Sequence, residues 1–204
     1  MTDTYEEKKA VSTVVNQVIY QLNKTREFSS AKAALANLRN SIGRPYSQTI
    51  DIWPLLFEKM PVEFIGRGEE LTSREQAILT ALQLYALHQQ GVEQSVSKEF
   101  VKGQWNNVGE SLSALRAGED SSAIDRRFNV MITSTTYDEL VHHLRQLVRM
   151  LRSKKRHEKI NYGMLANDLN AFLLGDEEKI RLKWSKAYYS THHRQEKGEE
   201  NNDK

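Results

Sequence analysis

Residues 136–156 read TYDELVHHLRQLVRMLRSKKR. Apolar residues recur there every three or four positions: Leu140, Leu144, Leu147, Val148 and Leu151. This spacing places them on one face of an α-helix. Thr136 and Glu139, three positions apart, have the pattern of a capping box, which predicts where the helix begins. The stretch is therefore predicted to be an amphipathic helix that packs one side into the protein.

A second face of this predicted helix is basic, with arginines at positions Arg145, Arg149, Arg152 and Arg156. Residues 145–159 contain seven basic residues and one acidic residue, a local net charge of +6, whereas the whole chain carries only +2. Like charges at this spacing destabilise a helix by about 0.2–0.5 kcal/mol per pair, and arginine suits bidentate phosphate contact. The stripe predicts binding to nucleic-acid backbone without base readout. The alternative is an ordinary solvated face.

Helical patterns also fill most of the remaining sequence. Only 10 of the 204 residues are Gly and 3 are Pro, and no long segment alternates polar and apolar residues as a strand would. One apolar face comprises Val11, Val14, Val15, Val18, Ile19 and Leu22. Other helices are predicted to begin at Ser29 or Ser30, Trp53, Thr72, Asn107, Ser121 or Ser122, Asn161 and Asp176. We expect an all-α fold of roughly eight to nine helices.

The predicted helices are expected to form two packed bundles. Residues 92–107 look like a linking region, so the boundaries are placed at 1–100 for an N-terminal bundle and 101–193 for a C-terminal bundle. After about His193 the sequence is polar and mixed in charge. Residues 194–204 are therefore expected to form a disordered tail.

Several classes of function are excluded by composition. The chain has no cysteine, which rules out disulfides, thiolate catalysis and cysteine-based zinc sites. The paired histidines 142–143 and 192–193 are adjacent, so the two rings of a pair point in different directions on a helix, and neither a metal site nor a cofactor is expected. The acidic start is unlike a signal peptide, and no stretch is apolar enough to span a membrane. A cytoplasmic location is expected.

One enzymatic alternative rests on Arg152 and His157. Their R-x4-H spacing is that of HEPN-type ribonucleases, which are helical. His157 would act as general acid and base, and Arg152 would orient and stabilise the phosphate. The pattern is short and arises by chance in basic stretches, and Ser153 replaces the larger polar residue usual after this arginine. A third alternative is a packing subunit whose arginines face acidic protein neighbours.

Several segments, in this order and spacing, resemble the CasB family, the small subunit of the type I-E CRISPR Cascade complex. In the second half they are 107–112 (NVGESL), 125–132 (DRRFNVMI), 138–151 (DELVHHLRQLVRML), 160–169 (INYGMLANDL) and 184–189 (WSKAYY). In the first half they are 31–39 (AKAALANLR) and 84–91 (LYALHQQG). The resemblance covers roughly residues 29–190.

The resemblance implies a non-catalytic helical subunit, present as a pair, within an RNA-guided DNA surveillance complex of antiviral defence. Its expected partners are target or displaced DNA, the other Cascade subunits and the guide RNA. Matching positions imply basic DNA contacts at Arg39, Arg74, Arg126, Arg127, Arg145 and Arg149. Arg126 or Arg127 could instead pair internally with Asp125 or Glu139. Two positions depart from the family pattern: Glu110 stands where an arginine often follows Gly109, and Phe172 where Trp is common.

Overall fold

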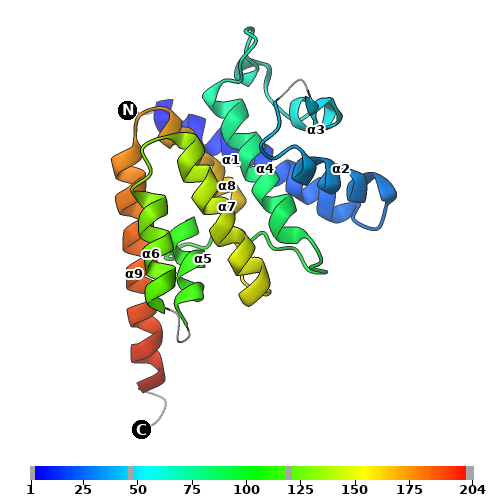
Figure 1. Ribbon diagram of the computed structural model, residues 1–204. Coiled ribbons are helices and arrows are strands. Elements are labelled where there is room, and N and C mark those ends of the chain that lie inside the picture. Colours follow the sequence, from blue (N-terminus) through cyan, green and yellow to red (C-terminus); the bar gives the residue numbers. More distant parts are fainter. Residues whose placement is uncertain (1–2, 46–47, 118–120, 201–204) are drawn as a thin grey trace.

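The computed structural model describes residues 3–45, 48–117 and 121–200, and within these ranges the fold is all-α (Figure 1). This confirms the predicted fold class. The nine α-helices of the described ranges are α1 (Asp3–Lys24), α2 (Ser29–Asn40), α3 (Trp53–Phe57), α4 (Ser73–Gln89), α5 (Val108–Ser113), α6 (Ser121–Ile132), α7 (Tyr137–Lys154), α8 (Tyr162–Leu173) and α9 (Glu177–Glu200). Short 3₁₀ turns η2 (Ile50–Ile52), η3 (Val62–Phe64) and η4 (Ala114–Arg116) connect some of them.

Four of the eight predicted helix starts coincide with side-chain caps. Thr72 and Glu75 form the predicted capping box of α4, and Asn107 and Asn161 cap α5 and α8. Two starts differ in detail. Phe28, not Ser29, occupies the cap position of α2. At α7, Thr136 accepts from the Glu139 amide as predicted, whereas the Glu139 carboxylate accepts from the amide of Thr135.

Helix α4 lies at the centre of the molecule (Figure 1). It packs against α1, α2, α7 and α8, and it is buried on nearly every side, including Ala77, Ile78 and Leu82. A helix surrounded in this way needs apolar residues all round rather than along one stripe. Helices α2 and α7, which are distant in sequence, therefore border the same central helix.

Polar groups tie α9 to the helices beneath it. The buried Asp168 of α8 accepts from Lys183 Nζ at 2.6 Å and from Trp184 Nε1 at 2.7 Å. Gly109 of α5 lies directly beneath the backbone of α9, where an added Cβ would be 2.9 Å from the carbonyl carbon of Trp184. Only glycine therefore permits α5 and α9 to approach this closely.

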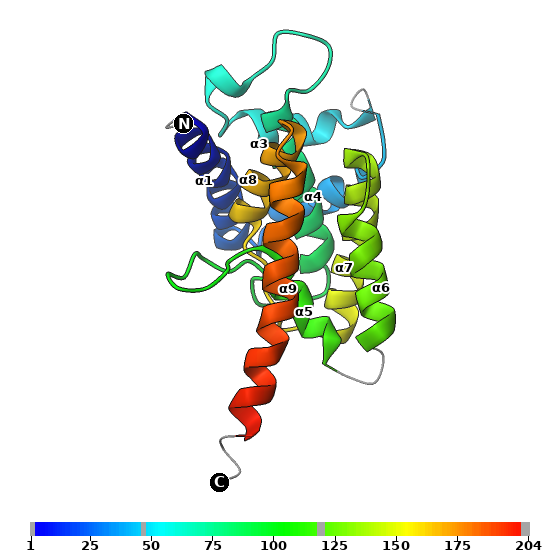
Figure 2. The same cartoon turned by 90° about the vertical axis from the view of Figure 1, so that its left-hand side faces the viewer.

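One continuous apolar core includes side chains from both halves of the chain, among them Val15, Leu82, Leu147 and Leu165. The expected boundary near residue 100 stays a prediction. Helix α9 reaches Glu200 (Figure 2), into the segment for which a disordered tail is expected, and residues 201–204 lie outside the described residues. None of the described helices combines the length and apolar character needed to cross a membrane.

Candidate nucleic-acid interface

A polar groove lies over α4, between the loop that follows α2 and the first half of α7. Its deeper part is a hollow of about 360 Å³. Polar side chains from three places line it: Gln76, Thr80 and Gln83 from α4, Asp138, His142 and Arg145 from α7, and Arg44 from the loop after α2. The groove therefore offers hydrogen-bond donors from its floor and positive charge from both walls.

On α7, the positive charges of Arg145 and Arg149 repel each other. Partial burial lowers the pKa of the Arg145 guanidinium from its ordinary value, and the positive charge of Arg149 lowers it further. The Nε of Arg145 is buried and has no hydrogen-bond partner within the described residues. Neither arginine forms an ion pair with a carboxylate in that part of the chain. An anion entering the groove would relieve this repulsion.

Arg39 of α2 lies outside this groove, near the end of α4. It lines a second hollow of about 620 Å³, together with Arg26 and Lys32 and with residues 89–93. Burial, and then the nearby charge of Arg152, lowers the pKa of Arg39. Arg39 and Arg152 are thus close enough to repel each other although they belong to different helices. Arg39 thus lies near α7, the helix that also carries Arg145 and Arg149.

The C-terminal half of the arginine stripe is engaged within the protein. Arg152 donates to the carbonyl of Leu87 at 3.2 Å and to Oε1 of Gln90 at 2.6 Å. Arg156 donates to the carbonyl of Gly91. From the end of α1, Arg26 donates to the carbonyl of Val92. Three guanidinium groups therefore hold the C-terminal end of α4, where the helix dipole favours positive charge.

Arg74 lies apart from the groove, at the first turn of α4. Its guanidinium carbon is 4.7 Å from the centroid of the Phe64 ring, and its Nη1 donates to the carbonyl of Glu63 at 3.4 Å. These contacts pack the arginine against the loop before α4. A DNA contact by Arg74 stays a prediction.

Arg126 and Arg127 are exposed on α6. The carboxylate of Asp125, a candidate for pairing with one of them, instead accepts from Nε of Arg116 and from the hydroxyl of Tyr188, at 2.8 and 2.7 Å. This leaves both arginine side chains directed to solvent on a helix that packs against α7. They could extend a basic surface beyond the groove.

Within the part of the chain that the structure describes, no hydrogen bond joins Arg152 to His157, the pair of the ribonuclease alternative. Arg152 is bonded to the end of α4, as described above, and His157 is exposed in the turn after α7. Among the described residues, no group of three or more histidines and carboxylates could hold a metal ion.

Sequence reasoning missed three basic residues that line the hollows, Arg26, Lys32 and Arg44. They lie singly in loops or at helix ends, where no periodic pattern marks them. It also missed what Glu110 does. The Glu110 carboxylate accepts from Nζ of Lys98 at 2.8 Å and from the amide of Asn106 at 3.1 Å, so it anchors the preceding loop.

The family model for CRISPR-associated protein Cse2 matches residues 34–189. The chain belongs to the Cse2 family. The predicted resemblance to CasB is thereby confirmed, and the match includes both walls of the groove. A search of curated proteins found no match.

Solved structures share this Cse2 fold. CasB from Thermobifida fusca has a TM-score of 0.69 at 24% identity, with 87% of this chain and 97% of that chain covered. CasB of M. ruber has a TM-score of 0.67 at 20% identity, covering 90% and 97%. A chain of a CRISPR RNA-guided surveillance complex has a TM-score of 0.69 at 19% identity, covering 92% and 98%.

Proposed function

We propose that this chain is the non-catalytic small subunit of a type I-E Cascade complex and binds DNA backbone without sequence specificity. Its role would be to stabilise the R-loop between guide RNA and target DNA in antiviral defence. Family membership supports this proposal, as does the similar fold of a chain in a CRISPR RNA-guided surveillance complex. The proposed partners are DNA, the other Cascade subunits with their guide RNA, and a second copy of this chain.

One observation supports DNA binding above the others. Arg145 lines the groove and Arg39 lines the second hollow, and the charges that lower the pKa values of these two residues are those of other arginines on α7, Arg149 and Arg152. Such clustering is unfavourable in the free protein and becomes favourable when a phosphate chain enters. Arg126 and Arg127 would lengthen this surface.

Modest backbone contacts suffice for this role. Exchanging a DNA duplex for an RNA–DNA duplex is nearly balanced in free energy, so protein contacts to the opened strands tip the equilibrium. Backbone contacts also suit a complex in which base pairing with the guide RNA already reads the sequence.

The deciding experiment is purification of the tagged protein from its native host, with identification of co-eluting proteins and RNA. We expect several protein partners and a small RNA. Arg145→Ala with Arg149→Ala should still assemble, and the resulting complex should bind target DNA more weakly. A free monomer without RNA would contradict the Cascade assignment, and unchanged DNA binding by the assembled variant would contradict the groove.

A further inference from the structure

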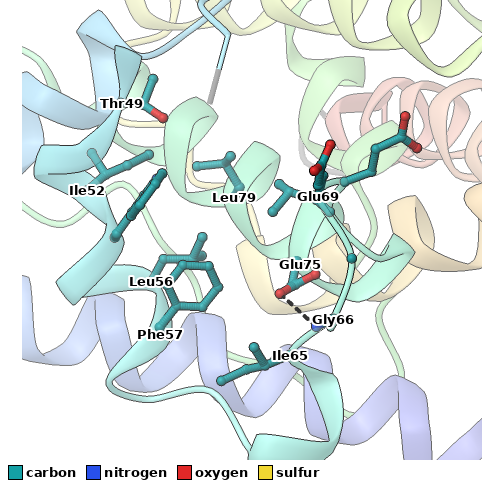
Figure 3. A pocket seen from close by; sticks show the side chains of 13 residues that line it. Thr49, Ile52, Leu56, Phe57, Ile65, Gly66, Glu69, Glu75 and Leu79 are labelled. Atoms are coloured by element: carbon teal, nitrogen blue, oxygen red, sulfur yellow. Dashed lines mark hydrogen bonds between the residues drawn. The ribbon is translucent and has the colours of Figure 1, made fainter. Parts of the chain in front are cut away.

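A separate apolar cavity lies between α3, the loop 65–71 and the first turns of α4 (Figure 3). It encloses about 230 Å³, which is room for one apolar side chain. Its apolar lining includes Ile52, Leu56, Phe57, Ile65 and Leu79. Glu69 and Glu70 of the loop also line it, and both are exposed.

The loop wall of this cavity is held in place by Glu75. The Glu75 side chain is buried, and its two oxygens accept from the amides of Gly66 at 3.1 Å and Thr72 at 2.7 Å (Figure 3 draws the first). The Thr72 hydroxyl in turn donates to the carbonyl of Phe64 at 3.1 Å. Because these bonds fix the backbone on both sides of the loop, the cavity is formed before any partner arrives, which lowers the entropic cost of binding.

Apolar side chains are exposed around the cavity. Ile65 and Trp53 line it and are 36% and 39% exposed. Ile50 and Val62, within three residues of lining residues, are 61% and 83% exposed. Apolar exposure gathered around a preformed hollow is typical of a protein–protein contact, and tryptophan is among the residues most enriched at the centre of such contacts.

The charge around this cavity is opposite to that of the polar groove. Residues 49–71 contain five carboxylates and two basic residues. Glu69 and Glu70 would repel phosphate and attract lysine or arginine. The exposed Trp53 ring adds a face on which a cation can stack. The occupant is therefore a protein segment with positive charge, and nucleic acid is disfavoured.

We propose that this cavity binds an apolar side chain flanked by lysine or arginine on a neighbouring protein of the complex. The apolar group fills the space between Leu56, Ile65 and Leu79, while the flanking cations contact Glu69, Glu70 and Trp53. This inference rests on the proposed function only in assuming a protein neighbour.

The test uses the tripeptides acetyl-Lys-Phe-Lys-amide, acetyl-Lys-Ser-Lys-amide and acetyl-Glu-Phe-Glu-amide as probes. The indole N–H signals of the full-length protein report binding in NMR spectra. Trp53 is at the cavity, whereas Trp184 is buried and bonded to Asp168, so it serves as an internal reference. We expect only the Lys-Phe-Lys peptide to shift the Trp53 signal saturably, with a Kd on the order of 1 mM for so small a ligand.

Two variants sharpen this test. Ile65→Arg places a charge at the half-exposed entrance and should abolish the Trp53 shift. Glu69→Gln with Glu70→Gln should weaken binding several-fold without changing the apolar lining. No Trp53 shift with Lys-Phe-Lys, or an equal shift with Lys-Ser-Lys or Glu-Phe-Glu, would overturn the proposal.

The same variants separate this inference from DNA binding. In the purified complex, Ile65→Arg should reduce the yield of at least one co-eluting protein, and the isolated variant should bind DNA with unchanged affinity. Equal yields of every protein would contradict the docking role and leave the DNA proposal standing. Conversely, absent DNA binding by the unaltered protein would leave the peptide result intact.

Discussion

Arg152 Nη1 of α7 donates to the carbonyl oxygen of Leu87 in the last turn of α4, at 3.2 Å. The same guanidinium reaches Gln90 Oε1, so this arginine joins two helices that are far apart in sequence. It also divides the arginine stripe into two halves. Arg145 lines the groove, with Arg149 close enough for its charge to act on Arg145, whereas Arg152 and Arg156 hold the end of α4.

Arg145→Ala with Arg149→Ala should weaken DNA binding and flatten its dependence on salt. Two lost phosphate contacts should make the slope of log K against log salt less steep by roughly 1.4–1.8. Fluorescence anisotropy with a labelled oligonucleotide at several salt concentrations measures this slope. Lys179→Ala with Lys186→Ala removes equal charge from α9 and should leave the slope nearly unchanged. Equal effects of the two double variants would mean that net charge alone governs binding.

Arg152→Ala should instead affect stability. Its loss removes a charge-assisted hydrogen bond at a helix C-terminus, worth about 1–2 kcal/mol. This corresponds to a fall in Tm of roughly 2–8 °C for a chain of this size. Thermal unfolding followed by circular dichroism measures it, with Arg149→Ala as the matched change one helical turn away. A larger fall for Arg149→Ala would contradict the division of the stripe.

His157→Ala should leave nucleic acid handling unchanged. His157 is exposed in a turn, and Arg152, its partner in the ribonuclease alternative, is bonded to α4. Purified unaltered protein should leave a labelled RNA intact over hours. Cleavage that disappears in His157→Ala would establish the ribonuclease alternative.

His88 should make the stability depend on pH. Burial, and then the charge of Arg152, lowers the pKa of His88 from 6.5 to about 4. Between these values the unfolded chain binds a proton that the folded protein does not, so stability is full above pH 6.5 and falls as the pH drops towards 4. The loss is up to about 3 kcal/mol. Urea unfolding at pH 7.5 and pH 5 should show a smaller difference for His88→Gln than for the unaltered protein.

Gly109→Ala should destabilise the protein strongly. The added methyl group would overlap the backbone carbonyl of Trp184, and backbone has little freedom to move away. Overpacking of this kind costs about 1–3 kcal/mol or more. Gly68→Ala is the control, because a Cβ there meets no atom within 4 Å. Chemical denaturation of both variants measures the contrast, and similar midpoints would contradict the close contact of α5 and α9.

Local sequence patterns predicted the helices well because their causes are local. The Thr72 box, the Asn161 cap and the apolar faces of α1 and α7 depend on residues three or four positions apart. Glu75 shows the limit of such patterns, because its carboxylate accepts from the amides of both Thr72 and Gly66. As a cap residue it was predictable, but its bond to the amide of Gly66 depends on how a distant loop returns to α4.

The candidate site was predicted less completely for the same reason. Periodicity alone put Arg145 and Arg152 on one stripe, but their different environments depend on where α4 ends relative to α7. Arg39 and Arg152 interact across two helices whose relation no local spacing encodes. The resemblance to CasB favoured Arg145 and Arg149 over Arg152 and Arg156, and the internal bonds of the latter pair agree with that preference.

The three arginines that hold the end of α4 bond mainly to backbone carbonyls, which every amino acid supplies, so these bonds place no demand on the side chains of Leu87, Gly91 and Val92. Other contacts do constrain this segment, since His88 and Gln89 are buried and hydrogen-bonded, whereas Arg26, Arg152 and Arg156 are themselves not readily replaced. Selection for architecture alone would preserve them. An evolutionary comparison of this family should therefore find that arginines with an internal acceptor are retained throughout, whereas those without one vary together with the DNA-binding strength of the complex.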